Sequence, residues 1–301
     1  MSAKQIINSS EQTGPVRAVR EPPSLPSDHN SSRLHRPALR PRSALSTQHS
    51  ALSQRLLALL SPLVLVGLWE VAARSGLLNA VFFPPPSGVL GALKAVTLSG
   101  DLPLDLLATT RRVLIGFLVG FFPAAAVGLL MGLSGNLRAI LLPITSLIYA
   151  IPKIAILPLF LVIFGLGERS KIAMIVASSF FFVLLNAMAG VLAIDRLHLD
   201  VAQSFGASRW QVIRTVALPG ALPFVLTGAR LALGFSLIVA VGSEFVIPGG
   251  HGIGTRIWLS WQILDIEQMY AGLIAAAALG VLLNFLMDEV ERRLLPYRKR
   301  A

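Results

Sequence analysis

The chain has 301 residues, of which 54% are hydrophobic and 14% charged, and its mean hydropathy is +0.71. A soluble domain of this size is markedly less apolar, so the composition predicts a polytopic membrane protein. The absence of cysteine excludes disulfide bonds and thiolate metal sites. Much of the net charge of +11 lies in the two tails. Basic tails beside membrane spans are explained by topology and a lipid bilayer, so no nucleic-acid partner is expected.

The first 52 residues contain many Ser, Pro, Arg and His residues and show little apolar periodicity. They predict a disordered basic N-terminal arm without a secretory signal peptide. A solvated tail is favoured over a membrane-surface or regulatory role. The remainder, residues 53–301, is predicted to be one transmembrane domain with a cytoplasmic loop at about 195–220.

From Leu56 onward the sequence predicts an all-α chain with about six transmembrane helices. Each apolar run has roughly the 17–25 residues that a bilayer core requires. The predicted spans are 56–73, 113–132, 139–164, 172–194, 222–246 and 271–287. Between the first two lies an amphipathic segment at 88–98.

Small residues recur every fourth position in the second predicted span. They are Gly116, Gly120, Ala124, Gly128 and Gly132. On a helix this spacing makes one face without bulk, where a neighbouring backbone can approach closely. The pattern predicts helix packing and carries no information about a ligand.

The distribution of basic residues predicts the orientation of the spans. With the N-terminus inside, 17 of the 26 Lys and Arg residues are cytoplasmic and 7 lie outside. The positive-inside rule therefore favours cytoplasmic N- and C-termini, with the loop at 195–220 also cytoplasmic.

Lys153 is the charge nearest the centre of a predicted span. It lies between Pro152 and Pro158, which remove backbone donors and should bend or break the third span. The lysine has two open readings: a cationic group near a pathway for an anion, or a side chain that snorkels or pairs with a neighbouring carbonyl. The second is favoured.

Glu244 lies near the outer end of the fifth predicted span. It could line a gate, cap a helix or form an ion pair with Arg256. Arg230, nearer the cytoplasmic end of the same span, is expected to snorkel.

Catalytic and nucleotide-binding motifs are missing from the sequence. It contains no Walker A pattern, no His-Glu-x-x-His and no Gly-x-Ser-x-Gly. Three of the five histidines lie in the arm, so no metal site is expected. Any ATP chemistry must come from another chain.

A polar segment, Asp200 to Pro219, interrupts the apolar sequence between the fourth and fifth predicted spans. Gly206 separates two short helix-compatible pieces, and Pro219 is expected to stop the second before the next span. Two amphipathic helices held between two spans favour a docking element over a plain connector.

The segment resembles the cytoplasmic signature loop of ABC importer permeases, Glu-Ala-Ala-x3-Gly-x9-Ile-x-Leu-Pro. Every spacing is kept, with identical residues at Ala202, Gly206, Leu218 and Pro219 and conservative changes at Asp200, Val201 and Val216. The stretches 151–159, 164–168 and 252–254 are similar to the nitrate/sulfonate/taurine branch. The resemblance covers about residues 55–300.

The resemblance implies a type I ABC importer transmembrane-domain fold in the cell inner membrane. The chain would be a non-catalytic permease subunit that binds no cofactor, with ATP and Mg used by a separate ATPase. Its expected partners are two ATP-binding subunits, a second permease subunit forming a homodimer, and a periplasmic solute-binding protein.

The resemblance also assigns roles within the loop. Ala202, Gly206 and Ala207 would pack closely against the ATPase, while Asp200 would cap the helix start or pair with a basic group of the ATPase. The complete set of expected coupling residues is Asp200, Ala202, Gly206, Ala207, Ser208, Leu218 and Pro219.

The substrate implied by the resemblance is a small solute, expected to be anionic, such as an aliphatic sulfonate, taurine or nitrate, and related permeases carry pyrimidine precursors. An ATPase-independent secondary transporter or channel is the alternative from another class. It would need a coupling cluster of charges at membrane depth. A membrane-embedded enzyme is a third alternative, and no paired carboxylates or nucleophile-base set is visible within the spans.

Overall fold

The computed structural model describes residues 44–247 and 249–295, and all regular structure within these ranges is helical. The chain divides into two units, residues 1–56 and 57–301. Most of the predicted N-terminal arm lies outside the described residues. Helix α1 (Ala44–Arg74) begins inside that predicted arm and contains the first predicted span.

Four described helices are long and apolar enough to cross a membrane, and one bent pair makes a possible fifth. The four contain α3 (Asp101–Leu133), α6 (Glu168–Leu192), α9 (Leu218–Val246) and α11 (Ile266–Leu294). These four or five candidate spans lie in the described residues, and the first predicted span, 56–73, lies within helix α1. The expected second, fourth, fifth and sixth spans are confirmed as helices.

Helix α6 lies at the centre of the bundle, between α3 and α9. The small-residue face of α3 packs on it. A side chain at Gly116 would come within 2.6 Å of Ile175, and one at Gly128 would meet the backbone of Leu184. Both neighbours belong to α6, so the glycines set how closely the two helices approach.

The opposite side of α6 meets α9 in the same way. A side chain at Gly190 would lie 2.7 Å from Phe224, and one at Gly228 would lie 2.7 Å from Asn186. Small residues at the two interfaces that α6 makes with α3 and α9 thus let three long helices pack at short distances, where dispersion contacts are dense.

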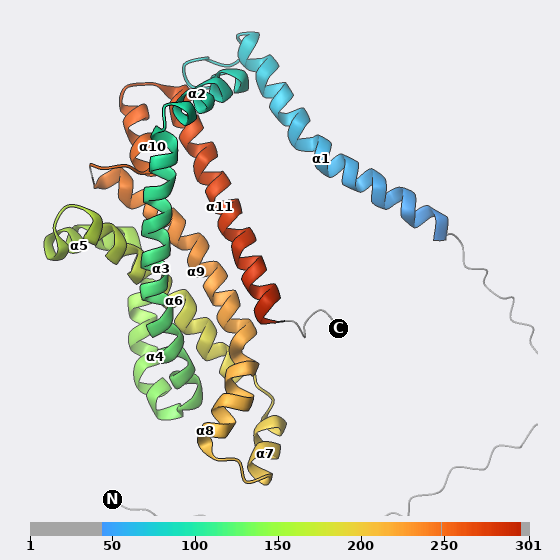
Figure 1. Cartoon of the computed structure of the whole chain (residues 1–301), viewed down its shortest axis with the longest axis vertical. Coiled ribbons are helices and arrows are strands. Elements are labelled where there is room, and N and C mark those ends of the chain that lie inside the picture. The colour runs from blue at the N-terminus through green and yellow to red at the C-terminus, as the bar shows by residue number, and fades with distance from the viewer. Residues whose placement is uncertain (1–43, 248, 296–301) are drawn as a thin grey trace, which may run out of the picture. The chain divides into compact units, whose positions relative to one another are not determined.

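The ends of the bundle carry different short helices (Figure 1). Helices α7 (Arg196–Ser204) and α8 (Arg209–Val212) form one end, while α2 (Pro86–Leu98) and α10 (Ile253–Gln262) lie at the other. Helix α2 confirms the predicted amphipathic segment. Helix α10 was not predicted.

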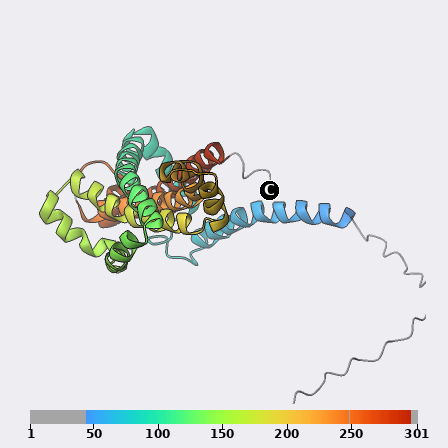
Figure 2. The same cartoon turned by 90° about the horizontal axis from the view of Figure 1, so that it is seen from below.

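The third expected span is broken, as its prolines predict. Helix α4 (Gly135–Ala150) is followed by a 3-10 turn, Lys153–Ile156, and by α5 (Leu157–Phe164). The two halves differ in direction by 87°. Viewed from below, the lime-green helix α5 lies to one side of the bundle (Figure 2).

We predict that Gly128→Val lowers the melting temperature of the detergent-solubilised protein. Overpacking of this kind costs about 1–3 kcal/mol, since the Leu184 carbonyl leaves no room for a side chain. Gly234→Val on α9 is the matched control, because nothing lies within 4 Å of its added side chain. Equal melting temperatures for the two variants would contradict the packing described.

Candidate functional site

The tip of the bundle, residues 195–219, contains the expected coupling residues. Helix α7 begins where the Leu197 amide donates to Asp195 Oδ1 at 3.0 Å. It ends at Gly206, whose φ of 74° is left-handed. The Ala207 amide then donates to the Ala202 carbonyl at 3.1 Å, as in a Schellman motif. Ala202, Gly206 and Ala207 are therefore joined by one helix-ending motif.

A capping box starts the second short helix. The Gln211 amide donates to Ser208 Oγ, and the Ser208 amide donates to Gln211 Oε1 at 2.7 Å. The two motifs fix the turn between α7 and α8, so Gly206 separates two short helices as predicted.

Two features of this loop differ from the expectations. Of the two roles given to Asp200, the cap of the helix start is wrong, because Asp200 lies within α7 and Asp195 caps the start; the pair with the ATPase stays a prediction. Pro219 does not stop the second helix. A π-helical turn, Ile213–Ala217, joins α8 to α9, giving one continuous helix of 38 residues, Arg209–Val246. Pro219 lies inside this continuous helix, directly after the π-helical turn, where it removes one backbone donor without ending the helix.

The tip exposes large apolar side chains. Phe205 is 86% exposed, Trp210 68%, Leu197 64% and Val201 47%. Exposed aromatic and aliphatic groups gathered on short helices are typical of a surface that a protein partner covers.

Lys153 occupies the break in the third span and stabilises it. Its ammonium donates to three carbonyls, those of Ile148 at 2.7 Å, Ile151 at 3.0 Å and Tyr149 at 3.3 Å. These carbonyls lie around the end of α4, where a cation also meets the negative end of the helix dipole. An ammonium has three hydrogens, so all its donors have acceptors within the chain.

Glu244 belongs to a buried polar network at the end of the bundle opposite the tip. It is 1% exposed and pairs with Arg112 on α3 at 2.6 Å, so of its three open roles the pair with Arg256 is not formed, whereas its bond from the first turn of α10 makes it a helix cap. Thr109 donates to the same carboxylate at 2.9 Å, and the Gly254 amide donates to it at 2.8 Å.

Arg112 joins three helices through this network. Its Nε donates to Glu168 Oε2 at 2.8 Å, where α6 begins, and its Nη1 binds Glu244 at the end of α9. The guanidinium is 3% exposed. A planar fork with five donors suits two carboxylates from different helices.

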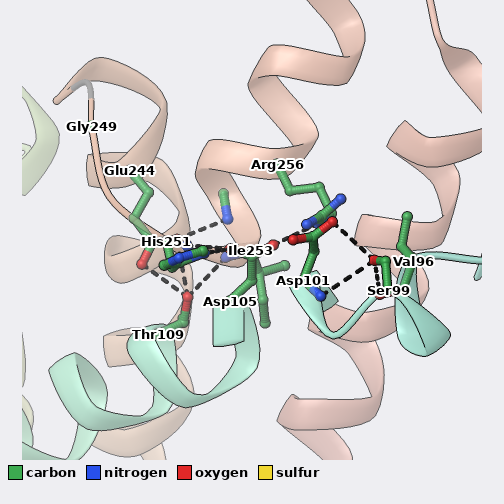
Figure 3. Close-up of polar contacts among 12 residues, drawn as sticks. Val96, Ser99, Asp101, Asp105, Thr109, Glu244, Gly249, His251, Ile253 and Arg256 are labelled. Carbon is green, nitrogen blue, oxygen red and sulfur yellow. Dashed lines mark hydrogen bonds and ion pairs between the residues drawn. The ribbon is translucent and has the colours of Figure 1, made fainter. Parts of the chain in front are cut away.

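A second set of contacts ties α10 to α3. Asp105 accepts from Arg256 Nε at 2.5 Å and from the Gly252 amide at 2.9 Å, and lies 3.3 Å from His251 Nδ1. Figure 3 shows these side chains converging between α3 and the segment that leads into α10. A side chain at Gly252 would come within 2.7 Å of both Arg112 and Glu244, so the Gly-x-Gly segment fits because it has no side chains there.

Several members of this network were missed in the sequence, namely Asp105, Thr109, Arg112 and Lys171. Asp105, Thr109 and Arg112 are spaced four and three residues apart, which puts them on one helical face. Lys171 is 1% exposed, and its ammonium donates to the Gly249 carbonyl at 3.3 Å. The spacing could have revealed the shared polar face of this helix from the sequence. It gave no information about partners more than 130 residues away.

The predicted site residues thus fall into three places. The coupling residues lie together at the tip. Lys153 and Pro152 line a cavity of about 240 Å³ at the break, while Glu244 lines a different one near α10. Arg230 pairs with Asp288 at 2.5 Å and with Glu291 at 2.7 Å on α11, rather than only snorkelling. Within residues 44–247 and 249–295, no three His, Asp or Glu side chains gather as metal ligands.

Comparison with known proteins shows similarity to membrane components of transport systems. The family model described as "Binding-protein-dependent transport system inner membrane component" matches residues 116–296. The taurine transport system permease protein TauC of Escherichia coli K12 is 35% identical over 239 residues, which are 78% of this chain and 86% of TauC.

A second relative in sequence is also described as a transport permease protein. A putative aliphatic sulfonates transport permease protein, SsuC of Bacillus subtilis strain 168, is 32% identical over 80% of this chain and 87% of its own length. Among solved structures, the MetNI methionine ABC transporter in an inward-facing conformation superposes with a TM-score of 0.57 at 21% identity. The match covers 66% of this chain and 98% of that chain. This last likeness concerns the fold.

We predict that Arg112→Met destabilises the protein strongly. Removing one partner of a buried ion pair costs about 3–5 kcal/mol, because Glu244 is left without its counterion. Adding Glu244→Gln should recover part of the lost melting temperature. Arg74→Met is the control, since its pair with Glu70 is exposed and worth roughly 0–1 kcal/mol. A wild-type melting temperature for Arg112→Met would contradict the network.

A second prediction concerns Lys153→Met. It removes the donors to three carbonyls, so we expect a lower melting temperature and a KM for the transported solute within about twofold of wild type. The exposed Lys94 provides the control substitution Lys94→Met. An unchanged melting temperature with a large rise in KM would instead support a role in the pathway.

Proposed function

The chain belongs to the family of binding-protein-dependent transport system inner membrane components, and on this premise we propose how it is driven. It is an inner-membrane permease subunit of an ATP-driven ABC importer and does not itself catalyse ATP hydrolysis. We propose that ATP and Mg are used by two separate ATP-binding subunits, which dock on the tip formed by α7 and α8. The tip would then be cytoplasmic, as would both termini.

The observation that carries the proposal is the exposed apolar surface of the tip together with its rigid link to α9. Phe205 and Trp210 offer large apolar areas to a partner. The turn beneath them is fixed by the Schellman motif at Gly206 and the capping box at Ser208. Asp200, exposed on α7, is proposed to meet a basic group of the ATPase.

Helix α9 provides a mechanical link between the tip and the opposite end of the bundle. The continuous helix Arg209–Val246 is about 57 Å long at 1.5 Å per residue. A displacement of the tip is therefore passed to the opposite end, where Glu244 joins α9 to Arg112. ATP would favour one of two packings of the spans, because the ATPase dimer binds the tip differently in its two states. Leu218 and Pro219 lie where the tip joins this helix.

The remaining partners follow from the family. A periplasmic solute-binding protein would deliver the solute, and a second copy of this chain would complete the pathway. The break at Pro152 and Pro158 is proposed to lie beside that pathway, since irregular backbone at membrane depth must be covered by protein or line a water-filled cavity. Lys153 would stabilise the break there. The substrate is proposed to be an organic sulfonate, because TauC and SsuC are described as taurine and sulfonate permeases.

We predict that Gly206→Asp inserts normally into the membrane but loses ATP-driven uptake at least tenfold. An aspartate places a negative charge at the exposed apolar tip, where a docked partner would have to desolvate it, and it also makes the left-handed φ of 74° more costly than in glycine. Gly206→Asn should keep most activity, since Asn tolerates this conformation.

Uptake of taurine and of an alkylsulfonate is measured in proteoliposomes that contain the permease and its ATP-binding subunits, with ATP on the side of the tip and the solute-binding protein opposite. Gly135→Asp is the matched control. This exposed glycine begins α4, where a carboxylate is favourable, and has no close neighbour. Normal uptake by Gly206→Asp would sink the coupling role, and uptake without the ATP-binding subunits would indicate a transporter that acts alone.

A further inference from the structure

The break between α4 and α5 gathers carbonyl oxygens around one point. The carbonyls of Ile148, Ile151 and Tyr149 lie 2.7, 3.0 and 3.3 Å from the ammonium nitrogen of Lys153. In an uninterrupted helix the Ile148 carbonyl would accept from the amide of residue 152, but Pro152 has no amide hydrogen. Several carbonyls directed at one position can replace the hydration shell of a monovalent cation. The break therefore has the construction of a cation site.

Aromatic rings complete this site. The ammonium of Lys153 lies 4.7 Å from the centroid of the Phe181 ring and 5.7 Å from that of Tyr149, which is within the range of cation–π attraction. Phe181 is buried on α6, against which the 3-10 turn of the break packs. Carbonyl dipoles and ring faces both attract positive charge, so two independent features of the structure favour a cation at this point.

The site opens on the cavity of about 240 Å³ at the break. Its lining residues are Tyr149, Ala150, Ile151, Pro152, Lys153, Ser178, Phe182 and Phe235. The rings of Phe182 and Phe235, from α6 and α9, lie 4.9 Å apart between centroids. These lining residues include no Asp or Glu, so a cation in the cavity would meet carbonyls and ring faces instead of a carboxylate.

The protein's own lysine fills this site. Lys153 follows Pro152 directly, so the break that frees the carbonyls also holds the ammonium beside them. A protonated amine has one donor for each of the three carbonyls. Covalent attachment gives the ammonium a high effective concentration at the site. A free cation can therefore enter only by displacing Lys153.

We propose that Lys153 is a tethered cation that occupies a monovalent-cation site at the break and thereby keeps free cations, such as potassium and small primary ammonium ions, out of the adjoining cavity. Without the lysine, the carbonyls and rings bind such ions, because potassium and methylammonium resemble the lysine head group in charge and size. The site itself does not depend on the proposed function. Its consequence for transport does rest on it: positively charged molecules are rejected beside the pathway.

The test removes the lysine and offers free cations in its place. The melting temperature of the purified full-length chain carrying Lys153→Ala is measured in detergent with methylammonium, potassium or N-methylglucamine chloride at equal concentration. We expect the variant to melt below wild type in N-methylglucamine chloride, because this bulky cation cannot reach the three carbonyls. Methylammonium should recover about half of the loss or more, and potassium part of it, since a ligand that binds the folded state stabilises it.

Lys94→Ala is the matched control, because this lysine is exposed on α2. It should respond to the three salts as wild type does, and the proposal is overturned if Lys153→Ala does the same. Lys153→Gln provides a second variant where the alanine variant does not fold, since its amide keeps two N–H donors without the charge. It should also melt higher in methylammonium than in N-methylglucamine chloride. Equal melting temperatures would make Lys153 a hydrogen-bond donor only and contradict the cation site.

Proteoliposome uptake separates this inference from the proposed function. With the ATP-binding subunits and the solute-binding protein present, we expect methylammonium to slow ATP-driven uptake by Lys153→Ala severalfold relative to N-methylglucamine and to leave wild type unchanged. Equal sensitivity of the two proteins to methylammonium would contradict the exclusion of cations. Absence of ATP-driven uptake of every solute tested would contradict the importer assignment, and the melting temperatures would still decide whether the cation site exists.

Discussion

The structure depends on one constraint, that polar groups within an apolar bundle must find partners inside the protein. Arg112 meets it by pairing with Glu168 and Glu244, and Lys153 meets it by binding the carbonyls freed at the break. The same requirement explains why a proline-interrupted span is followed at once by a lysine. Among the described residues, Trp69 Nε1 and Thr255 Oγ1 are buried atoms that depart from the rule.

Close packing at glycines and ion pairs between helices stabilise different parts of the bundle. Small residues on α3 and α9 let both helices approach α6, which supplies dispersion contacts without directional groups. The ion pairs then join helix ends: Arg112 at one end, and Arg230 with Asp288 at the other. A long helix packed and pinned in this way moves as a unit, which suits a part that carries motion from the tip to the opposite face.

The sequence predicted local features well and distant pairings poorly. Gly206 as a helix separator and the break at Pro152 follow from backbone chemistry within a few residues. The passage of the helix through Pro219 needed a π-helical turn, which residue identity alone does not signal. The roles left open for Glu244 included a helix cap, which it forms at α10, and a pair with Arg256, which it does not form because the packing of α3 against α9 brings Arg112 closer. Which of the two arginines pairs with Glu244 depends on how the helices pack, and the local sequence does not determine that packing.

The central claim, that the α7–α8 tip is the cytoplasmic surface driven by the ATPase, is open to one direct measurement. The chain has no cysteine, so Val201→Cys on the exposed face of α7 introduces a single thiol. We expect a cross-linker with one maleimide and one amine-reactive ester to join this thiol to a lysine of the ATP-binding subunit in the assembled transporter, with a yield that changes when ATP binds. Labelling of the same thiol from the periplasmic side of intact cells, without a cross-link to the ATP-binding subunit, would contradict the account.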